Sequence, residues 1–395
     1  MMLDRARLDA EVDALRPVLV GIAERLHDHP ELAFEEHHAA AWIAERIEAE
    51  GVPVERALGG VATAFRARVG AGDGPRVAIL AEYDALPEIG HACGHNLIAA
   101  GALGSFLALA RVLRALPGVG GSIELIGTPA EEGGGGKIRL LEAGVFDHVD
   151  AAMMFHPYDR DLLANPALAT TKLEFSFRGA PAHAAIAPWD GQSALTACLE
   201  TFRLIDAQRV HFRDGVRVHG IVTDGGQAVN IIPERAACVF QLRAPQLREL
   251  ERVRTIAERC ARAAALASGV ELQIVERQGY RSMQNNLTLA RRFGAALSAL
   301  GRPAPEVDPS AGAGSTDMGD VSHAVPSIHP YLAICDQGHA LCHQHAFAAC
   351  ARSERGYAAA CVAAKALART AADLLEDPAL LVAVRAEFEH SRASA

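Results

Sequence analysis

The sequence lacks an excess of basic residues and a long apolar run. Lysine and arginine number 38 against 48 aspartate and glutamate, so the net charge is −10. Proteins that bind nucleic acid or acidic lipid need a basic surface, and we expect neither partner. The apolar stretch at 97–110 has 14 residues, whereas a membrane-spanning helix needs ~20. We therefore expect no membrane partner.

Features of secreted proteins are also scarce. The opening residues, MMLDRARLDAEVDALRP, contain scattered acids and no apolar core of a signal peptide. Eight cysteines spread over 395 residues do not resemble the disulfide framework of a small secreted domain. We expect a cytoplasmic protein with reduced cysteines. Four of them lie among small apolar residues and are expected in the core, namely Cys198, Cys238, Cys260 and Cys361.

The pattern of apolar residues predicts an α/β protein. Half of the residues are hydrophobic and 22% are charged, as in globular proteins. At ~150 residues per domain, the length corresponds to two or three domains. Continuous apolar runs at 77–81, 123–127 and 151–155 predict strands buried on both faces of a mostly parallel sheet. The apolar segment 96–113 is expected to be a crossover helix between two of them.

The middle of the chain predicts a second domain. From about residue 172 the expected order is β-α-β-β-α-β, which is typical of a ferredoxin-like unit. Its strands are expected at 173–178, 216–222, 236–243 and 270–275, and its helices at 192–207 and 246–267. A helix near 287–300, a strand at 327–334 and a long C-terminal helix follow. We expect a catalytic domain of residues 1–170 and 282–395, with an inserted domain at 171–281.

Potential metal ligands follow three consecutive predicted strands. Glu82-Tyr83-Asp84 and the sequence HACGHN follow the first strand, Glu131-Glu132 the second, and His156 the third. Ligands of parallel sheets bind beyond the carboxyl ends of the strands, so we expect these side chains in one crevice. Cysteine, histidine and carboxylate together suit zinc or a similar ion.

Each of these motifs also has a purely structural interpretation. Glu131 and Glu132 can divide metal binding from proton transfer, or they can begin a solvated helix. His156 can be a strand-end histidine bonded to the backbone. The sequence HACGH can hold a buried cysteine between polar caps. For Cys93 and His95 to face one site the chain must turn between them, and Gly94 allows that turn.

Six stretches together resemble a known family. They are AEYDALPEIGHACGHN, GTPAEEGGGGK, FHP, FRGAPAHAA, NIIPE and GSTDMGDVSHAVPSIHPY. They resemble the amidohydrolase branch of metallopeptidase family twenty, in family order over nearly the whole chain. That branch includes aminoacylases, hippurate hydrolases, auxin-conjugate hydrolases, p-aminobenzoyl-glutamate hydrolase and a β-alanyl-lysine dipeptidase. The stretches AEYDALP and VPSIHPY are most similar to the last two. The resemblance implies a zinc-peptidase-like catalytic domain with an inserted ferredoxin-like lid that forms a homodimer.

The resemblance also implies two divalent metal ions per chain. Cys93 would bridge them, where many relatives have aspartate. His95 and His156 would hold one ion with it, and Glu132 and His343 the other. The thiolate favours zinc, while relatives often use manganese, cobalt or nickel.

Further roles follow from the same resemblance. Glu131 would be the general base, and Asp84 would orient a metal-ligating histidine. In the inserted domain, His183 of the PAH motif would steady the reacting carbonyl, and Asn230 of NIIP would contact the substrate.

The C-terminal metal ligand has rivals. Spacing to the following aromatic residue favours His343, and His339 and His345 are the alternatives. His91 lies four residues before His95, but the family does not use that position, so we expect it to be structural. Asp317 follows a glycine-rich loop and is expected to border the pocket, without an assigned role.

The function expected from these residues is metal-dependent hydrolysis of an amide bond in a small molecule. Dipeptides, N-acyl amino acids and p-aminobenzoyl-glutamate share a free carboxylate, which arginine or backbone N–H groups would bind. Arg243 and Arg281 lie near ends of predicted strands. Two alternatives stay open: an amidase with Cys93 as nucleophile beside His91 or His95, and a catalytically silent member that only binds a ligand.

Overall fold

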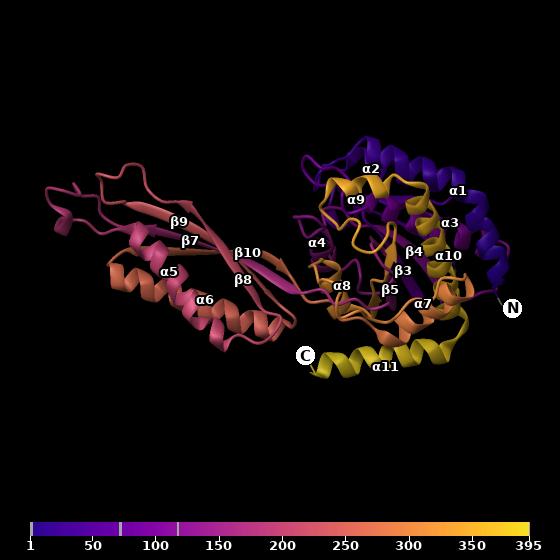
Figure 1. Ribbon diagram of the computed structural model, residues 1–395. Helices are drawn as coiled ribbons and strands as arrows, with labels where there is room; N and C mark the ends of the chain where they lie inside the picture. The colour runs from indigo at the N-terminus through magenta and orange to yellow at the C-terminus, as the bar shows by residue number, and fades with distance from the viewer. Residues whose placement is uncertain (1–2, 71–72, 117, 395) are drawn as a thin grey trace. The chain divides into compact units, whose positions relative to one another are not determined.

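The chain forms two compact units. The computed structural model describes residues 3–70, 73–116 and 118–394 (Figure 1). Unit 1 combines Met1–Pro166 with Met283–Ala395, and unit 2 is Ala167–Ser282. We expected the insertion at residues 171–281. Each unit has a hydrophobic core of its own.

Unit 1 contains two sheets surrounded by helices. Its strands are β1 (Val54–Arg56), β2 (Phe65–Gly70), β3 (Arg76–Ala81), β4 (Ser122–Gly127), β5 (Ala151–Met153), β6 (His156–Tyr158), β11 (Ser327–Ile328) and β12 (Tyr331–Ala333). Its helices are α1 (Arg5–Asp28), α2 (His37–Ala49), α3 (His95–Arg114), α4 (Gly136–Glu142), α7 (Leu287–Ala299), α8 (Met318–Ala324), α9 (His345–Ala351), α10 (Glu354–Glu376) and α11 (Pro378–Ser394), with a short 3-10 helix at Leu58–Gly60.

The main sheet of unit 1 is mostly parallel. Its strand order is β1-β2-β4-β3-β5-β11. Strands β4, β3, β5 and β11 pair in parallel, while β1 and β2 are antiparallel to their neighbours. A second, two-stranded sheet pairs β6 with β12 in parallel. The residues of β4 and β5 are all buried, as expected for strands covered on both faces; the one buried acid among them, Glu124, pairs with Arg68 of β2. The expected α/β fold with a mostly parallel sheet is confirmed.

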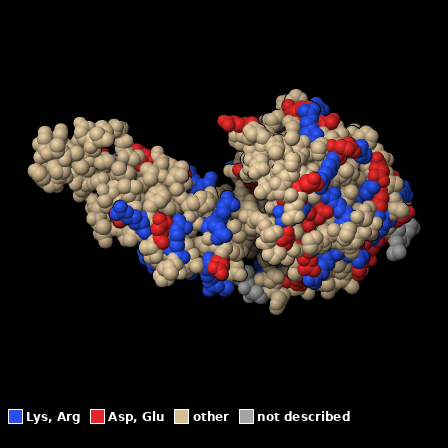
Figure 2. All heavy atoms as spheres, viewed as in Figure 1, with Lys and Arg blue, Asp and Glu red and all other residues tan. Residues whose placement is uncertain are grey.

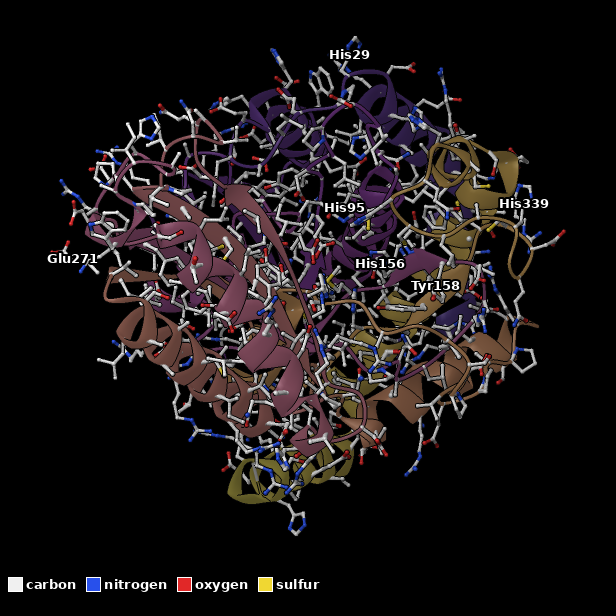
Figure 3. All side chains as sticks on the ribbon, turned by 60° about the vertical axis from the view of Figure 1, so that its left-hand side comes forward. His29, His95, His156, Tyr158, Glu271 and His339 are labelled. Atoms are coloured by element: carbon white, nitrogen blue, oxygen red, sulfur yellow. The ribbon has the colours of Figure 1, made fainter. Side chains whose placement is uncertain are left out.

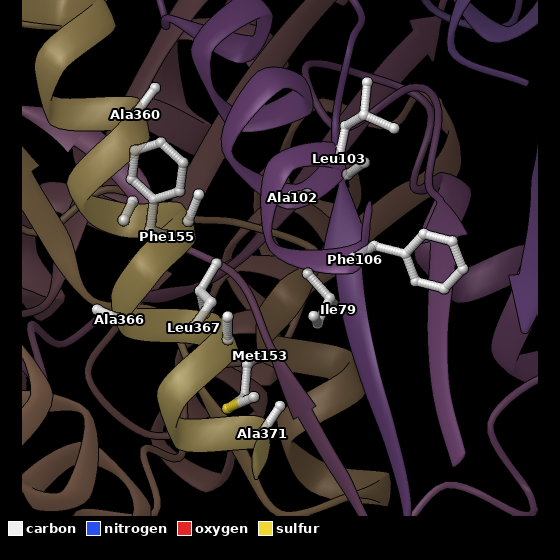
Figure 4. Close-up of a cluster of buried hydrophobic side chains, with 14 of the residues drawn as sticks. Ile79, Ala102, Leu103, Phe106, Met153, Phe155, Ala360, Ala366, Leu367 and Ala371 are labelled. Carbon is white, nitrogen blue, oxygen red and sulfur yellow. The ribbon is translucent and has the colours of Figure 1, made fainter. Parts of the chain in front are cut away.

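Helix α3 forms the centre of the core of unit 1 and packs against α1 and α10. Figure 4 shows Leu103 and Phe106 of α3 in the buried cluster that also contains Leu367 of α10. In the described part of the chain, α3 is the one helix long and apolar enough to span a membrane, but 94% of its apolar window is buried inside the protein. It is therefore a core helix. A Cβ on Gly101 would lie 2.4 Å from the Phe155 ring, so glycine permits this close packing.

Ion pairs join the first helix of unit 1 to its last long helix. Arg369 of α10 pairs with Asp9 of α1, and Lys365 pairs with Asp13. On the face of unit 1 visible in Figure 2, acidic and basic side chains are interspersed. Pairs of this kind each contribute ~0–1 kcal/mol, so apolar packing, rather than charge, holds α1 and α10 together.

Unit 2 has the order β-α-β-β-α-β. Its four-stranded sheet is antiparallel, with the order β10-β7-β9-β8. Helices α5 and α6 pack on each other and on the sheet. The elements are β7 (Ala169–Arg178), α5 (Ala194–Gln208), β8 (Arg217–Asp224), β9 (Arg235–Ala244), α6 (Leu247–Ser268) and β10 (Glu271–Tyr280), with 3-10 helices at Pro188–Asp190 and Arg209–His211.

Three predicted elements are interrupted in the structure. The strand expected at 151–155 ends at Met153, and β6 begins at His156. The strand expected at 327–334 is divided into β11 and β12. The long C-terminal helix ends at Glu376, before Pro378 starts α11. Proline lacks the N–H of a helical hydrogen bond and clashes with the preceding turn, which explains the last break.

Candidate metal centre

A glycine turn places Cys93 and His95 in one site. Gly94 precedes α3 with φ +77°, and a Cβ there would lie 2.8 Å from Pro157 Cγ. No larger residue fits this turn. Cys93 Sγ lies 3.4 Å from Nε2 of His156, the first residue of β6. The ring centroids of His95 and His156 are 6.1 Å apart, and both residues are labelled in Figure 3.

Potential ligand atoms form three overlapping clusters in the described part of the chain. Within each cluster, the ligand atoms lie within 4.8 Å of one another. The clusters are Cys93-His95-His156, Cys93-Glu132-His343 and His95-Glu131-Glu132. The structure therefore brings together the five expected metal ligands and the expected base. A mixed set of sulfur, nitrogen and oxygen donors suits a borderline ion such as zinc.

Asp84 orients His95 toward the clusters. Asp84 Oδ1 lies 3.0 Å from His95 Nδ1, and Asp84 Oδ2 accepts a hydrogen bond from the backbone N–H of Glu132 at 2.9 Å. Burial alone would raise the pKa of Asp84, but the charge and hydrogen bond of His95 lower it. Because Asp84 occupies Nδ1, the other ring nitrogen faces the cluster. This arrangement is typical of metal-ligating histidines.

The adjacent carboxyl groups of Glu131 and Glu132 differ in character. Glu132 Oε2 lies 3.2 Å from His343 Nε2. Burial opposes ionisation of Glu132, but the hydrogen bond to His343 and the charge of His95 give it a lowered pKa. Burial and the charge of Glu132 raise the pKa of Glu131 well above its usual value. Glu132 is thus suited to ligation, and Glu131 to accepting a proton. Both lie in the turn before α4, so the helix-start interpretation is wrong.

A buried carboxyl group supports the turn that carries Glu131. Ala130 has φ +62°, which is uncommon for a residue other than glycine. Its N–H donates a 2.9 Å hydrogen bond to Glu36 Oε1, and Thr63 Oγ1 donates one to Glu36 Oε2, also at 2.9 Å. Burial raises the pKa of Glu36 to about 7. Glu36 was not among the expected site residues, because its contact with Ala130 spans 94 positions.

A buried lysine neutralises two carboxylates close to His95. Lys137 Nζ lies 2.5 Å from Glu82 Oε1 and 2.7 Å from Asp317 Oδ1. Burial alone would lower the pKa of Lys137, but Asp317 and Glu82 raise it. Glu82 Oε2 lies 3.4 Å from His95 Nε2. Asp317 is fully buried in this pair rather than at the border of a pocket, which corrects our expectation. In the sequence, the lysine at the end of the GGGGK motif was a signal that could have indicated this buried ion pair.

The structure favours one of the three C-terminal histidines. The N–H of His343 donates a 2.9 Å hydrogen bond to Ala92 O, which holds this loop against the HACGH turn. Among the described residues, the ligand clusters include His343 but neither His339 nor His345. His91 is buried outside the clusters, and burial lowers its pKa to about 3.

The expected substrate residues of the insertion lie in unit 2. Ala184 N–H donates a 3.0 Å hydrogen bond to Asn230 O, so the loops of His183 and Asn230 are neighbours. Both side chains are exposed. Arg243 lies in β9, and Arg281 follows β10. Their roles toward a substrate stay predictions.

Comparisons with known proteins agree with this geometry. Residues 78–371 match the family described as Peptidase family M20/M25/M40. A Xaa-Arg dipeptidase of Mus musculus is 38% identical over 400 residues, covering 98% of this chain and 92% of that protein. One of the subunits of the p-aminobenzoyl-glutamate hydrolase of Escherichia coli is 33% identical, covering 75% and 65%. A dinuclear metal-binding M20 peptidase of Bacillus subtilis has the same fold, with a TM-score of 0.71, 22% identity and coverage of 92% and 99%.

Proposed function

Because the chain belongs to peptidase family M20/M25/M40, we propose that it is a metal-dependent hydrolase of small amides that carry a free carboxylate. Hydrolysis of amide bonds is the shared activity of its relatives. The substrates we propose are dipeptides, N-acyl amino acids and p-aminobenzoyl-glutamate. The observation that carries the proposal is the convergence of five ligand side chains beside Glu131.

The residues present fit two divalent ions. Among the described residues, His95 Nε2 and Glu132 Oε1 are buried without a hydrogen-bond partner, and buried polar atoms normally have one. Cys93 would hold both ions, because it is the residue that the Cys93-His95-His156 and Cys93-Glu132-His343 clusters share. His95 and His156 would complete one site, and Glu132 and His343 the other. Zinc or manganese is our choice, with cobalt and nickel as further candidates. When bound, such ions make water a nucleophile at neutral pH and polarise a carbonyl group.

The chain supplies the proton transfer. Glu131 is buried, and its carboxyl oxygen lies within 4.8 Å of ligand atoms of His95 and Glu132, a position suited to a general base. We assign Glu131 to take the proton of the attacking water and to give it to the nitrogen of the leaving amine. Asp84 acts through His95 and is a positioning residue.

His183 is suited to donate a hydrogen bond to the substrate. The N–H groups of Ala185 and Ile186 lie 3.3 Å from His183 Nδ1 and donate to it. An accepting Nδ1 leaves the proton of neutral histidine on Nε2. We propose that Nε2–H donates a hydrogen bond to the oxygen of the scissile carbonyl. One such donor typically stabilises the transition state by ~3–4 kcal/mol. Asn230, in the neighbouring loop, is assigned to the substrate.

We also propose a cytoplasmic homodimer that associates through unit 2. Strand β8 lies at the edge of its sheet. Ile221 and Val222 of this strand are 66% and 41% exposed. An edge strand with exposed apolar side chains is a template for pairing with another chain.

The first test combines metal analysis with hydrolysis. The purified protein is analysed for metal and assayed with dipeptides, N-acyl amino acids and p-aminobenzoyl-glutamate, before and after chelation. Dipeptides with C-terminal arginine belong in the panel because of the Mus musculus relative. We expect about two ions per chain, and activity that chelation abolishes and Zn²⁺ or Mn²⁺ restores.

Two neighbouring variants separate the roles of the carboxyl groups. Glu131→Gln should keep its metal and lose activity by ~10²–10⁴-fold, because proton transfer is removed. Glu132→Gln should bind less metal. A fully active Glu131→Gln protein contradicts the assignment. Metal without cleavage of any substrate favours the silent ligand-binding alternative, and chelator-resistant activity that thiol alkylation stops favours Cys93 as nucleophile.

A further inference from the structure

A second cysteine lies beside the candidate metal centre. The loop that carries Cys342 is held against the HACGH turn by the hydrogen bond from His343 N–H to Ala92 O, at 2.9 Å. The neighbouring thiol of Cys342, together with burial, raises the pKa of Cys93 well above its usual value. In the described part of the chain, Cys93 belongs to two ligand clusters and Cys342 to none. Cys342 therefore touches the shared ligand without being a ligand itself.

The backbone geometry is compatible with a disulfide. The 2.9 Å hydrogen bond from His343 N–H to Ala92 O holds the peptide groups that adjoin the two cysteines in direct contact. The Cα atoms of a disulfide are usually ~4.4–6.8 Å apart. Residues 93 and 342 each adjoin one partner of the Ala92–His343 hydrogen bond. Both cysteines are free thiols in this structure.

The pair Cys93–Cys342 is more accessible to solvent than a second cysteine pair of this protein. Cys198 and Cys238 are also in contact, but both are fully buried in the core of unit 2. Cys342 is half-buried, and its neighbours Leu341 and His343 are exposed. A small oxidant can therefore reach Cys342 without unfolding the protein.

We propose that Cys93 and Cys342 form a redox modification site, in which a hydroperoxide converts the metal-free centre to a disulfide that excludes metal. The proposal rests on the proposed function insofar as Cys93 is a metal ligand. Disulfides of cytosolic proteins are usually transient and redox-sensing, and thiols reverse them by exchange.

The chemistry requires one hydroperoxide for each disulfide. The sulfur of Cys342 attacks the terminal oxygen of the hydroperoxide, the O–O bond breaks, and an alcohol (or water, from hydrogen peroxide) leaves. The Cys342 sulfenic acid is then attacked by the sulfur of Cys93, which forms the S–S bond and releases water. The two thiols lose two electrons and two protons in total, and the hydroperoxide is reduced.

Metal and disulfide compete for the same sulfur atom. A metal ligand must be a thiolate, and a disulfide sulfur no longer provides one. Oxidation would remove the common member of two ligand clusters at once. Conversely, a metal ion bound to Cys93 would prevent its sulfur from attacking the sulfenic acid of Cys342. Loss of metal would therefore open the site to oxidation, and oxidation would keep the site empty until a thiol reduced it.

The test compares metal-free with metal-loaded full-length protein. Both are treated with hydrogen peroxide and denatured, and their free thiols are counted. We expect two of the eight thiols to be lost from the metal-free protein and none from the loaded protein. Mass spectrometry should find one cross-link, between the peptides that contain Cys93 and Cys342. Zinc binding, measured by calorimetry, should be weakened roughly 100-fold or more by oxidation and restored by dithiothreitol.

Two cysteine variants control for unspecific oxidation. Cys342→Ser should form no such cross-link, and its metal-free form should keep all seven remaining thiols after treatment with peroxide. Cys350→Ser, which removes a half-buried thiol in contact with Cys335, should still form it. Eight remaining thiols, a Cys335–Cys350 cross-link alone, or unchanged zinc binding after oxidation overturns the proposal. These measurements need no substrate. A failure of the proposed hydrolysis would therefore be seen separately: the reduced protein would bind zinc but cleave no amide.

Discussion

The candidate centre depends on single buried groups that are not ligands themselves. Glu36 is fully buried and accepts a hydrogen bond from Ala130, the residue before the proposed base. Ala130 has a left-handed conformation, which raises its energy by ~1–3 kcal/mol and persists only when its surroundings hold it. Glu36 is thus a positioning residue for Glu131.

The protonation of Glu36 should make stability depend on pH. Burial raises its folded-state pKa from 4.5 to about 7, so the folded protein holds this proton more tightly than the unfolded chain does. The stabilisation is present below pH 4.5 and is lost as the pH rises through 7. Relative to Glu36→Gln, the free energy of unfolding of the wild type should fall by on the order of 3 kcal/mol over this range.

Urea unfolding at several pH values measures this difference. Fluorescence of Trp42 in α2 reports on unit 1, because Trp189 of unit 2 is already 78% exposed. Glu35→Gln changes a neighbouring, exposed carboxyl group and should show no such pH dependence. A constant difference between wild type and Glu36→Gln from pH 4.5 to 8 contradicts the assignment.

At the scale of the secondary-structure elements, Lys137 connects three segments of unit 1. It lies in α4, Glu82 follows β3, and Asp317 precedes α8. All three side chains are buried. Removal of one member of a buried ion pair leaves an uncompensated charge, which is far less favourable than loss of an exposed pair.

Lys137→Met should therefore destabilise unit 1 by ~3–5 kcal/mol. Lys365→Met is the matched control, because Lys365 pairs with Asp13, whose side chain is 61% exposed; its expected effect is below ~1 kcal/mol. Urea unfolding of both variants tests this difference. Equal effects would mean that the buried lysine has no special role.

The sequence predicted those parts of the structure that depend on neighbouring residues. The buried strands β3 and β4 and helix α3 follow from apolar patterns, and HACGH and Glu131-Glu132 place their ligands within a few positions. Glu36, Glu82 and Lys137 were not assigned, because their partners lie 94, 55 and 180 positions away. No local pattern reports such contacts. The division between β11 and β12 was missed although Pro330, which has no N–H for a strand hydrogen bond, lies between them.

At the scale of the whole molecule, we expect the exposed edge strand β8 of unit 2 to form the interface of a dimer. Ile221→Lys places a charge on the exposed edge strand β8, which should oppose strand pairing. Light scattering should give twice the chain mass of 41.8 kDa for the wild type and the single mass for the variant. Val382→Lys, at an equally exposed position of unit 1, should remain dimeric. A wild type of 41.8 kDa contradicts the proposed dimer.

The division of unit 1 into two chain segments affects its biosynthesis. Unit 2 is complete once residue 282 has left the ribosome, whereas unit 1 still lacks β11 and α10, which pair with β5 and pack on α3. At ~5–20 residues per second, synthesis from residue 167 to 376 takes about 10–40 s. During this interval the apolar surface of α3 that α10 later covers stays open on the nascent chain. Unit 2 is therefore able to fold first, and the unfinished unit 1 is the part of the nascent protein that a chaperone would bind.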